Sequence, residues 1–381
     1  MGRGSRWRGF AVNALTVLGS IVFTVLALEV AFRFLPVATA PWVEPPTAAH
    51  PIQRYVANTP YTWSVGWNFQ IVSRGRTNAQ GFIAGYDYDA AATSPLVAVI
   101  GDSFVEAMAV PFAESITGRL QQSLGARGRA YAFAQSGAPL SQYIAYARHA
   151  CEIYRPERLV ITVVGNDFDE SVFANRQRNG FFHLHPKADG GFDFLLSPLP
   201  PMGVAERVGR NSALALYFFR NISKSGLIGL LTIGRAQAEE RGVGPYVGNT
   251  SAAAGTDRVA EGEKVIDWFL DQLSNATCVP PKHIVIMVDA MRPEVYDPPR
   301  LAAARSSYFG RMRAKVLADA ASRGFVVVDL EQAFTTSYSK DGRRFEPPID
   351  NHWNEQGHAV AADAIIARLA DWAPLSEART Q

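Results

Sequence analysis

The stretch LVAVIGDSFVEA, residues 96–107, passes from an unbroken apolar run through Gly-Asp-Ser into residues that can open a helix. The run lacks polar alternation, which is typical of a parallel strand covered on both faces. A serine at such a junction either caps the helix or presents its hydroxyl at the edge of the sheet. The choice between a cap and a nucleophile depends on the residues that the rest of the chain brings to that edge.

Further Val- and Ile-rich runs follow this one, and helical spacing fills the gaps between them. The runs are RAYAFAQSGAPL (129–140), RLVITVVGND (158–167), KHIVIMVDA (282–290) and GFVVVDL (324–330). The helical segments are 115–124, 141–154, 259–275, 299–322 and 354–372. Alternating strands and helices with right-handed crossovers predict an α/β fold, a doubly wound, flavodoxin-like parallel sheet of five strands with helices on both faces.

The N-terminus carries the pattern of a membrane anchor. Arg3, Arg6 and Arg8 precede the segment 10–28, which has no charged residue and is long enough to cross a bilayer as a helix. We therefore expect a cytoplasmic basic tail at 1–9, a transmembrane helix within 10–37, and the remainder on the outer, periplasmic side. A cleaved signal peptide ending near Ala38-Thr39-Ala40 is the alternative, but the apolar run is long for a signal.

Composition bounds the remaining possibilities. The chain has 381 residues, of which 48% are hydrophobic, so either one large domain with additions or two modest domains fit. Its net charge is +2, so a nucleic-acid partner is not expected. Two cysteines, Cys151 and Cys278, are too few for a disulfide scaffold, and they either pair or stay as buried thiols.

The predicted domain extends over 91–375. It is preceded at 38–90 by a spacer, over 38–60, and by irregular structure or a short hairpin, over 61–90. An insertion at about 169–257 interrupts the strand–helix rhythm. Its first part, FFHLHPKADGGFDFLL (181–196), predicts an exposed hairpin. Its strongly apolar part at 211–234 fits a lid, a membrane-facing patch or, as the favoured interpretation, additional core, and 236–257 predicts a flexible loop.

In a doubly wound sheet, ligands bind beyond the carboxyl ends of the strands, so residues that end the apolar runs should meet. Ser103 follows the first run, Gly137 the second and Asn166 the third, and Asp350 and His352 lie past the fifth. Ser103 needs a base, which His352 supplies, and Asp350 can hold the imidazole. The N–H groups of Ser103 and Gly137 and the Asn166 amide are candidates for an oxyanion hole.

These blocks together resemble the SGNH, or GDSL-type, hydrolase superfamily. The matching residues are GDSF at 101–104, Gly137, GND at 165–167 and DNHWN at 350–354, in the order of the family. The resemblance covers roughly 95–375 and implies ester hydrolysis or acyl transfer through an acyl-serine, without a metal or an organic cofactor.

One position departs from the family pattern. Most of the family places the acidic residue three positions before the histidine. In this chain that position is Ile349, and the acidic residue is Asp350, two positions before His352. This D-x-H-W arrangement resembles relatives that acetylate exopolysaccharides, although in those the acid and histidine precede the serine. Glu346 and Asp341 are therefore alternative orienting groups.

Four further polar residues are expected to have structural roles or to lie at the surface. Arg292 either contacts substrate or, as favoured, braces a loop. His358, one turn into a helix capped by Asn354, is expected to be structural. His183 and His185 share one face of the predicted hairpin but lack a third metal ligand.

The sequence thus predicts a membrane-anchored serine esterase acting on acyl esters, acetyl esters of cell-envelope carbohydrate among them. An O-acyltransferase with the same acyl-serine is the alternative. A non-catalytic carbohydrate-binding or assembly protein is the alternative of another class. The expected partners are an acylated substrate and, through the N-terminal helix, the lipid bilayer.

Overall fold

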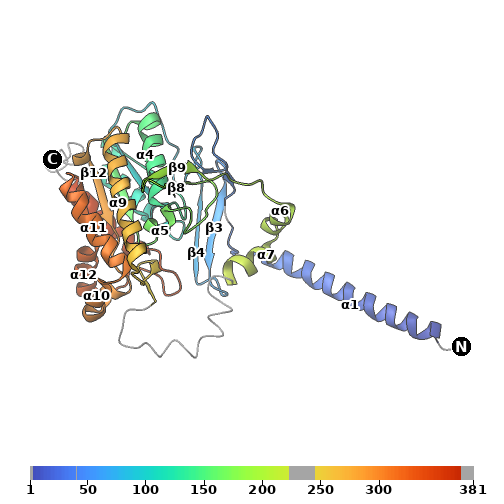
Figure 1. Cartoon of the computed structure of the whole chain (residues 1–381). Helices are drawn as coiled ribbons and strands as arrows, with labels where there is room; N and C mark the ends of the chain where they lie inside the picture. The colour runs from blue at the N-terminus through green and yellow to red at the C-terminus, as the bar shows by residue number, and fades with distance from the viewer. Residues whose placement is uncertain (1–2, 40, 223–244, 370–381) are drawn as a thin grey trace. The chain divides into compact units, whose positions relative to one another are not determined.

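The structure is a computed structural model that describes residues 3–39, 41–222 and 245–369. Its centre is a five-stranded parallel sheet in the order β13-β12-β7-β5-β6 (Figure 1). The strands are β5 (Leu96–Gly101), β6 (Arg129–Ala134), β7 (Arg158–Val163), β12 (Ile284–Val288) and β13 (Val326–Asp329). Each matches one of the apolar runs, and the order is the flavodoxin-like one, so the predicted fold class is confirmed.

Alternate residues of each strand belong to two separate cores, one on each face of the sheet. In β5, Ala98 and Ile100 belong to one core, and Val97 and Val99 to the other, all fully buried. The first core includes residues of α4 (Leu140–Tyr154), α9 (Thr256–Ala276) and α11 (Tyr308–Ser322). The second includes residues of α3 (Ile116–Leu124), α12 (Leu330–Asp341) and α13 (Glu355–Arg368). Cover on both faces explains why the strands are apolar throughout.

The register of the sheet brings the strand ends to one edge. Gly101 is paired with Ala134 of β6, and Ile100 with Ile161 of β7. The chain turns in opposite directions on either side of the β5–β7 pair, which makes this the switch point at which doubly wound sheets bind ligands. The residues that follow β5, β6 and β7 are therefore close neighbours in space.

Two expectations of local structure are corrected. The single helix expected at 299–322 is two helices, α10 (Pro298–Ala304) and α11, because the Ser307 side chain caps a new helix start by accepting from the Gly310 N–H. The spacer expected at 38–60 contributes to the domain, since Ile52, Gln53 and Tyr55 are buried. Short strands β1 (Val43–Glu44) and β2 (Arg54–Tyr55) pair there.

The two cysteines form a disulfide in the structure. Cys151 lies near the end of α4 and Cys278 follows α9, and their Cα atoms are 5.6 Å apart. The bridge joins two helices that pack on the same face of the sheet. Of the two possibilities that the sequence left open, the structure has the paired one.

Part of the predicted insertion folds on this domain. The hairpin of β8 (Phe182–Pro186) and β9 (Phe192–Leu196) is confirmed, but its expected exposure is wrong for His183. This imidazole is buried, contacts the Phe181 carbonyl and the Ser197 hydroxyl, and its pKa is lowered to about 4 by burial. A second pair, β10 (Tyr246–Val247) and β11 (Thr250–Ser251), occupies part of the expected loop, whose residues 236–244 lie outside the described residues.

The chain divides into two compact units. The larger contains the sheet, and the smaller comprises residues 1–40, 62–72 and 201–235. Strands β3 (Pro60–Val65) and β4 (Ile71–Arg76) pair as a hairpin where the chain leaves and re-enters the larger unit. The apolar segment at 223–234 and the C-terminal residues from 370 lie outside the described residues.

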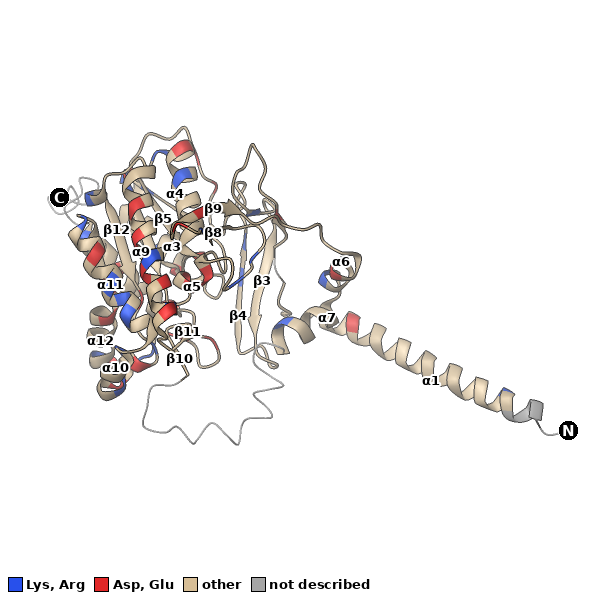
Figure 2. Cartoon of the chain, in the orientation of Figure 1, with Lys and Arg blue, Asp and Glu red and all other residues tan. Residues whose placement is uncertain are grey.

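The smaller unit contains α1 (Arg3–Phe32), α6 (Val204–Asn211), α7 (Ala213–Leu216) and the π-helical turn η3 (Tyr217–Ile222). Residues Trp7–Phe32 of α1 are long and apolar enough to cross a membrane, and the protein buries none of their most apolar window. In Figure 2 the ribbon of α1 is tan along its middle, so no Lys, Arg, Asp or Glu interrupts that part of the helix. A helix of this kind fits a membrane anchor or a signal sequence equally by length and composition.

Candidate active site

The nucleophile candidate opens a one-turn helix directly after β5. Ser103 is the first residue of α2 (Ser103–Glu106), and Asp102 caps this helix by accepting from the Phe104 N–H at 2.9 Å. The first N–H groups of a helix have no partner within it, so the Ser103 N–H stays available beside its own hydroxyl. Ser103 is therefore placed to attack as well as to stabilise an oxyanion.

His352 and Asp350 meet this serine, as the sequence predicts. His352 Nε2 lies 2.8 Å from Ser103 Oγ, and His352 Nδ1 lies 2.5 Å from Asp350 Oδ1. The same Asp350 oxygen accepts from the His352 backbone N–H at 3.0 Å, which fixes the short loop that carries both residues. The hydrogen-bond chain from carboxylate to imidazole to hydroxyl is the arrangement that activates a serine nucleophile.

The loop of His352 is held by a buried ion pair. Arg292 donates to Asp289 Oδ2 at 2.9 Å and to the Asn351 carbonyl at 3.0 Å. Asp289 also accepts from Trp353 Nε1 at 3.0 Å. The structure thus supports the bracing interpretation of Arg292, because its charge is buried within the protein and directed at the His352 loop.

The alternative orienting acids do not reach His352. Glu346 pairs with Arg292 and with the Tyr296 hydroxyl, and Asp341 pairs with Arg343. His358 is structural, as expected: it is buried, its Nδ1 accepts from the Ile116 N–H, and burial lowers its pKa to about 3. These contacts leave Asp350 as the acid of the candidate triad.

Gly137 follows β6 with a φ of +75°. A side chain there is strained by the backbone alone, and a Cβ atom would lie 1.6 Å from Nη1 of Arg178. Among the described residues, no hydrogen bond occupies the N–H of Gly137, as a donor for an oxyanion requires.

Asn166 follows β7 and precedes α5 (Asp167–Ser171), at the sheet edge expected for it. Its side chain donates a hydrogen bond to Glu170. Burial raises the pKa of the Glu170 carboxyl, and this hydrogen bond is one of the smaller effects that lower it. The carboxylate of Glu170 orients the Asn166 amide. The structure brings Gly137, Asn166 and Ser103 to the ends of three adjacent strands.

Sequence reasoning missed Glu106, which joins the nucleophile helix to the oxyanion loop. Its buried carboxylate accepts from the Ser136 N–H at 3.1 Å, from the Ser136 hydroxyl, and from the Tyr55 hydroxyl at 2.5 Å. Burial raises the pKa of Glu106, and these hydrogen bonds oppose the shift. The spacing of three residues from Ser103 on one helix was the only signal in the sequence.

Arg178 was also missed. Its guanidinium donates to the Ser136 carbonyl at 2.5 Å and lies against the face of Gly137. It belongs to the inserted segment before β8, for which no motif marks a contact with the sheet edge. Arg178 adds a positive charge directly beside the proposed oxyanion donors.

The β10–β11 turn of the insertion borders the site from the other side. A Cβ on Gly165 would lie 1.8 Å from the Gly248 carbonyl oxygen, so this turn packs directly on the residue before Asn166. Asn249 accepts from the Asn351 side chain, next to His352. This turn therefore links the Asn block to the His block.

Buried acids surround the nucleophile. Burial raises the pKa of Asp102 to about 6. The hydrogen bond from the Phe104 N–H and the attraction to His352 oppose this shift. Asp167 is also buried, accepts from the Val164 N–H and from the Tyr143 hydroxyl, and has a pKa raised by burial and by the Asp102 charge.

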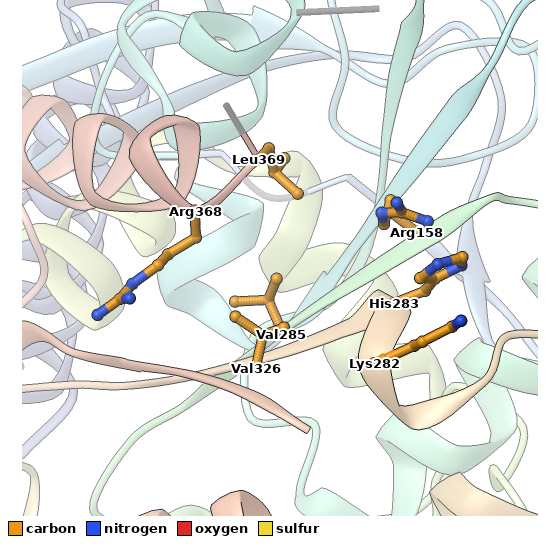
Figure 3. Close-up of a pocket in the computed structure, with 7 residues that line it drawn as sticks. All are labelled: Arg158, Lys282, His283, Val285, Val326, Arg368 and Leu369. Carbon is orange, nitrogen blue, oxygen red and sulfur yellow. The ribbon is translucent and has the colours of Figure 1, made fainter. Parts of the chain in front are cut away.

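A cavity of about 250 Å³ lies elsewhere, at the amino ends of the strands (Figure 3). It is lined by Arg158, Lys282, His283, Val285, Val326, Arg368 and Leu369. Because Ser103 lies at the carboxyl ends, this cavity is separate from the candidate site. Within residues 3–39, 41–222 and 245–369, no group of three or more His, Cys, Asp or Glu side chains is placed to hold a metal ion.

No family model and no curated protein matches the chain. Among similar solved structures, TesA has a TM-score of 0.36 and 12% identity, covering 74% of this chain and 99% of its own. A member of the lipolytic protein G-D-S-L family from Veillonella parvula DSM 2008 has a TM-score of 0.38 and 10% identity, covering 72% and 97%.

A two-domain esterase active on acetylated mannans has a TM-score of 0.37 and 9% identity, covering 76% of this chain and 50% of its own.

Proposed function

We propose that the chain is a serine ester hydrolase of SGNH type that works through an acyl-serine. The observation that supports this most directly is the hydrogen-bond chain from Asp350 through His352 to Ser103 Oγ, built from residues 249 positions apart. A binding or assembly protein has no need of an activated hydroxyl, so the non-catalytic alternative leaves this geometry unexplained.

The reaction follows from the geometry. His352 Nε2 takes the proton of Ser103 as Oγ attacks the ester carbonyl, and Asp350 stabilises the imidazolium. The N–H groups of Ser103 and Gly137 and the Asn166 amide hold the tetrahedral oxyanion. His352 returns the proton to the departing alkoxide, which leaves as an alcohol. Water then attacks the acyl-serine by the same steps and releases the carboxylic acid.

The proposed substrate is an acyl ester, including acetyl esters, of carbohydrate outside the cytoplasm. This substrate class is supported by helix α1, in which basic residues at the start are followed by an apolar span, an arrangement that favours an N-terminus in the cytoplasm and the large unit on the outer side. The disulfide between Cys151 and Cys278 fits the same compartment, because such bonds persist in oxidising environments.

Acyl transfer to a sugar hydroxyl is the second candidate. Two observations favour it: the D-x-H-W arrangement at 350–353, and the β10–β11 turn that packs beside Asn166 and Asn351. Transfer needs the acyl-serine to meet a sugar hydroxyl before water, and a covering segment at the site favours that outcome.

The test measures hydrolysis of p-nitrophenyl acetate by the full chain in detergent micelles, with and without an oligosaccharide acceptor. Hydrolysis predicts nitrophenol release at a rate that the acceptor leaves unchanged. Transfer predicts faster release together with an acetylated sugar detected by mass spectrometry. If Ser103→Ala retains the full rate of the unaltered chain, the proposed nucleophile is wrong.

A further inference from the structure

The smaller unit presents an apolar surface that the described protein leaves uncovered. Val204 and Val208 of α6 are 78% and 65% exposed, and Phe218 and Phe219 of η3 are 53% and 74% exposed. Surface valines and phenylalanines are usually scattered singly, whereas these four lie within sixteen residues on consecutive helical elements. We call the segment 204–222 the apolar platform.

Hydrogen bonds to the Glu29 carboxylate attach the platform to the end of α1. The Glu29 carboxylate accepts from the Ser212 hydroxyl at 2.7 Å, from the Ala213 N–H at 3.0 Å and from the Leu214 N–H at 3.1 Å. Glu29 thus accepts from the first N–H groups of α7, while Ser212 caps the same helix locally by accepting from the Ala215 N–H at 3.1 Å. Arg33 completes the contact by donating to Glu29 and to the Asn211 carbonyl.

Aromatic and amide contacts hold the other end of the platform. The ring centroids of Tyr217 and Phe32 lie 4.5 Å apart, and the Tyr217 hydroxyl donates to the Trp67 carbonyl. Asn221 is buried, donates to the Ser64 hydroxyl and accepts from the Ala38 N–H. The platform is therefore positioned by these contacts, and Val204, Val208, Phe218 and Phe219 are left exposed.

The position of the platform along α1 indicates which environment covers it. Residues Trp7–Phe32 of α1 have the length and hydropathy to span a bilayer, and the platform is attached at Glu29–Arg33, where that span ends. In α6, Val204 and Val208 are spaced by one turn, as are Glu206 and Arg210 on another face. One apolar and one charged face, with Arg207 and Arg220 nearby, fits a helix lying in a lipid interface.

From this placement we infer that the apolar platform inserts into the outer lipid–water interface beside the end of α1. The inferred site binds the bilayer itself, through Val204, Val208, Phe218 and Phe219, while Glu29 sets its depth. It adds a second membrane contact to the predicted anchor and is independent of the proposed esterase activity. An apolar protein partner on the same surface is the competing outcome.

The test places a photo-crosslinking benzoylphenylalanine at single positions of the full chain, reconstituted in vesicles of phosphatidylethanolamine and phosphatidylglycerol. Val208 and Phe219 are the test positions. Ile21, within α1, is the lipid-facing control, and Glu206, on the charged face of α6, is the matched control. After illumination, mass spectrometry separates lipid adducts from protein adducts.

The inference predicts lipid adducts at 208, 219 and 21, and at least tenfold fewer at 206. Protein–protein adducts at 208 or 219, or adducts at 21 alone, overturn it. Equal adducts at 206 and 208 also overturn it, because the apolar face would then have no preference for lipid. Absence of adducts at 21 overturns it as well, since α1 would not lie in the bilayer.

A second variant tests the role of Glu29. Glu29→Ala removes the carboxylate that caps α7, so lipid adducts at 219 should fall severalfold while those at 21 persist. Glu206→Ala is the matched control and should leave both unchanged. Persistence of the adduct at 219 in Glu29→Ala would show that the platform is not positioned through α1.

Discussion

The strands of the sheet and the apolar platform both contain many apolar residues, but those of the strands are buried and several of those of the platform are exposed. Val99 of β5 is completely buried between its two neighbouring strands and α-helical cover, whereas Val208 of α6 is 65% exposed. At the sheet edge, Asp350, Glu106 and Arg292 each have hydrogen-bond partners within the same unit. In the platform, Asn221 is buried and bonded to Ser64, whereas Val208 and Phe219 are exposed.

The difference shows that an apolar stretch of sequence predicts that its residues are removed from water. It does not predict whether protein or another environment covers them. In the sheet the cover is supplied by helices that follow each strand. In the platform the element attached to it is α1, which the protein itself does not cover. Substitutions should therefore have large effects at the sheet edge and small effects on the stability of the platform.

The largest effect is expected for Asp350→Asn. The amide cannot stabilise the imidazolium of His352 as a carboxylate does, so kcat/KM for p-nitrophenyl acetate should fall by about 10³- to 10⁴-fold while the fold persists. Asp341→Asn is the matched control, because Asp341 pairs with Arg343 and not with His352. A loss below tenfold in Asp350→Asn would remove Asp350 from the triad.

Asp102→Asn is expected to change stability with pH. Burial raises the pKa of Asp102 from 3.8 to about 6, so the native state binds the proton more tightly than the unfolded chain. The stabilisation from protonation is present below about pH 4 and lost as pH rises through 6. Asparagine does not titrate, so the stability of the variant relative to the unaltered chain should rise by about 3 kcal/mol from pH 4 to pH 8.

Urea unfolding at the two pH values measures this change. The surface variant Asp193→Asn on β9 should show no comparable difference. A relative stability of Asp102→Asn that is the same at pH 4 and pH 8 would contradict the raised pKa.

A matched pair of valines tests the comparison directly. Val99→Ala removes two methyl groups from a filled core and should lower the free energy of unfolding by about 2 kcal/mol. Val208→Ala should change it by less than about 0.5 kcal/mol in detergent micelles, because the side chain has few protein neighbours to lose. Equal costs in urea unfolding would show that the platform is part of a core.

A smaller effect on activity than that of Asp350→Asn is expected for Glu106→Gln. An amide keeps one acceptor but sets an N–H₂ group against either Ser136 or Tyr55, which displaces the loop of Gly137. We expect kcat to fall by about tenfold with KM little changed, since the oxyanion donors act in the transition state. Glu114→Gln, whose exposed carboxylate pairs with Arg119, is the control. An unchanged kcat would leave Glu106 without a positioning role.

The sheet and the triad could be predicted from the sequence because each depends on short-range patterns joined by one topological rule. Unbroken apolar runs mark buried parallel strands, and their carboxyl ends converge, so Ser103, Gly137 and Asn166 are placed without knowledge of side-chain contacts. His352 follows because it is the base in the block after the last strand.

The missed residues depend on contacts that no local pattern encodes. Tyr55 reaches Glu106 from a segment expected to be a spacer, and Arg178 reaches Ser136 from an insertion. His183 was expected to be exposed because a hairpin of alternating residues fits solvent on one face. His183 is instead buried, and its contact with the Ser197 hydroxyl forms only once the chain has folded.

The most direct test of the central claim is covalent labelling of the full chain by a serine-reactive fluorophosphonate, located by mass spectrometry of peptides. A single adduct on Ser103, lost in His352→Ala with the fold intact, is the result that the site geometry predicts. Absence of an adduct, or an adduct on another residue such as Ser136, would contradict the assignment of Ser103 as the activated nucleophile.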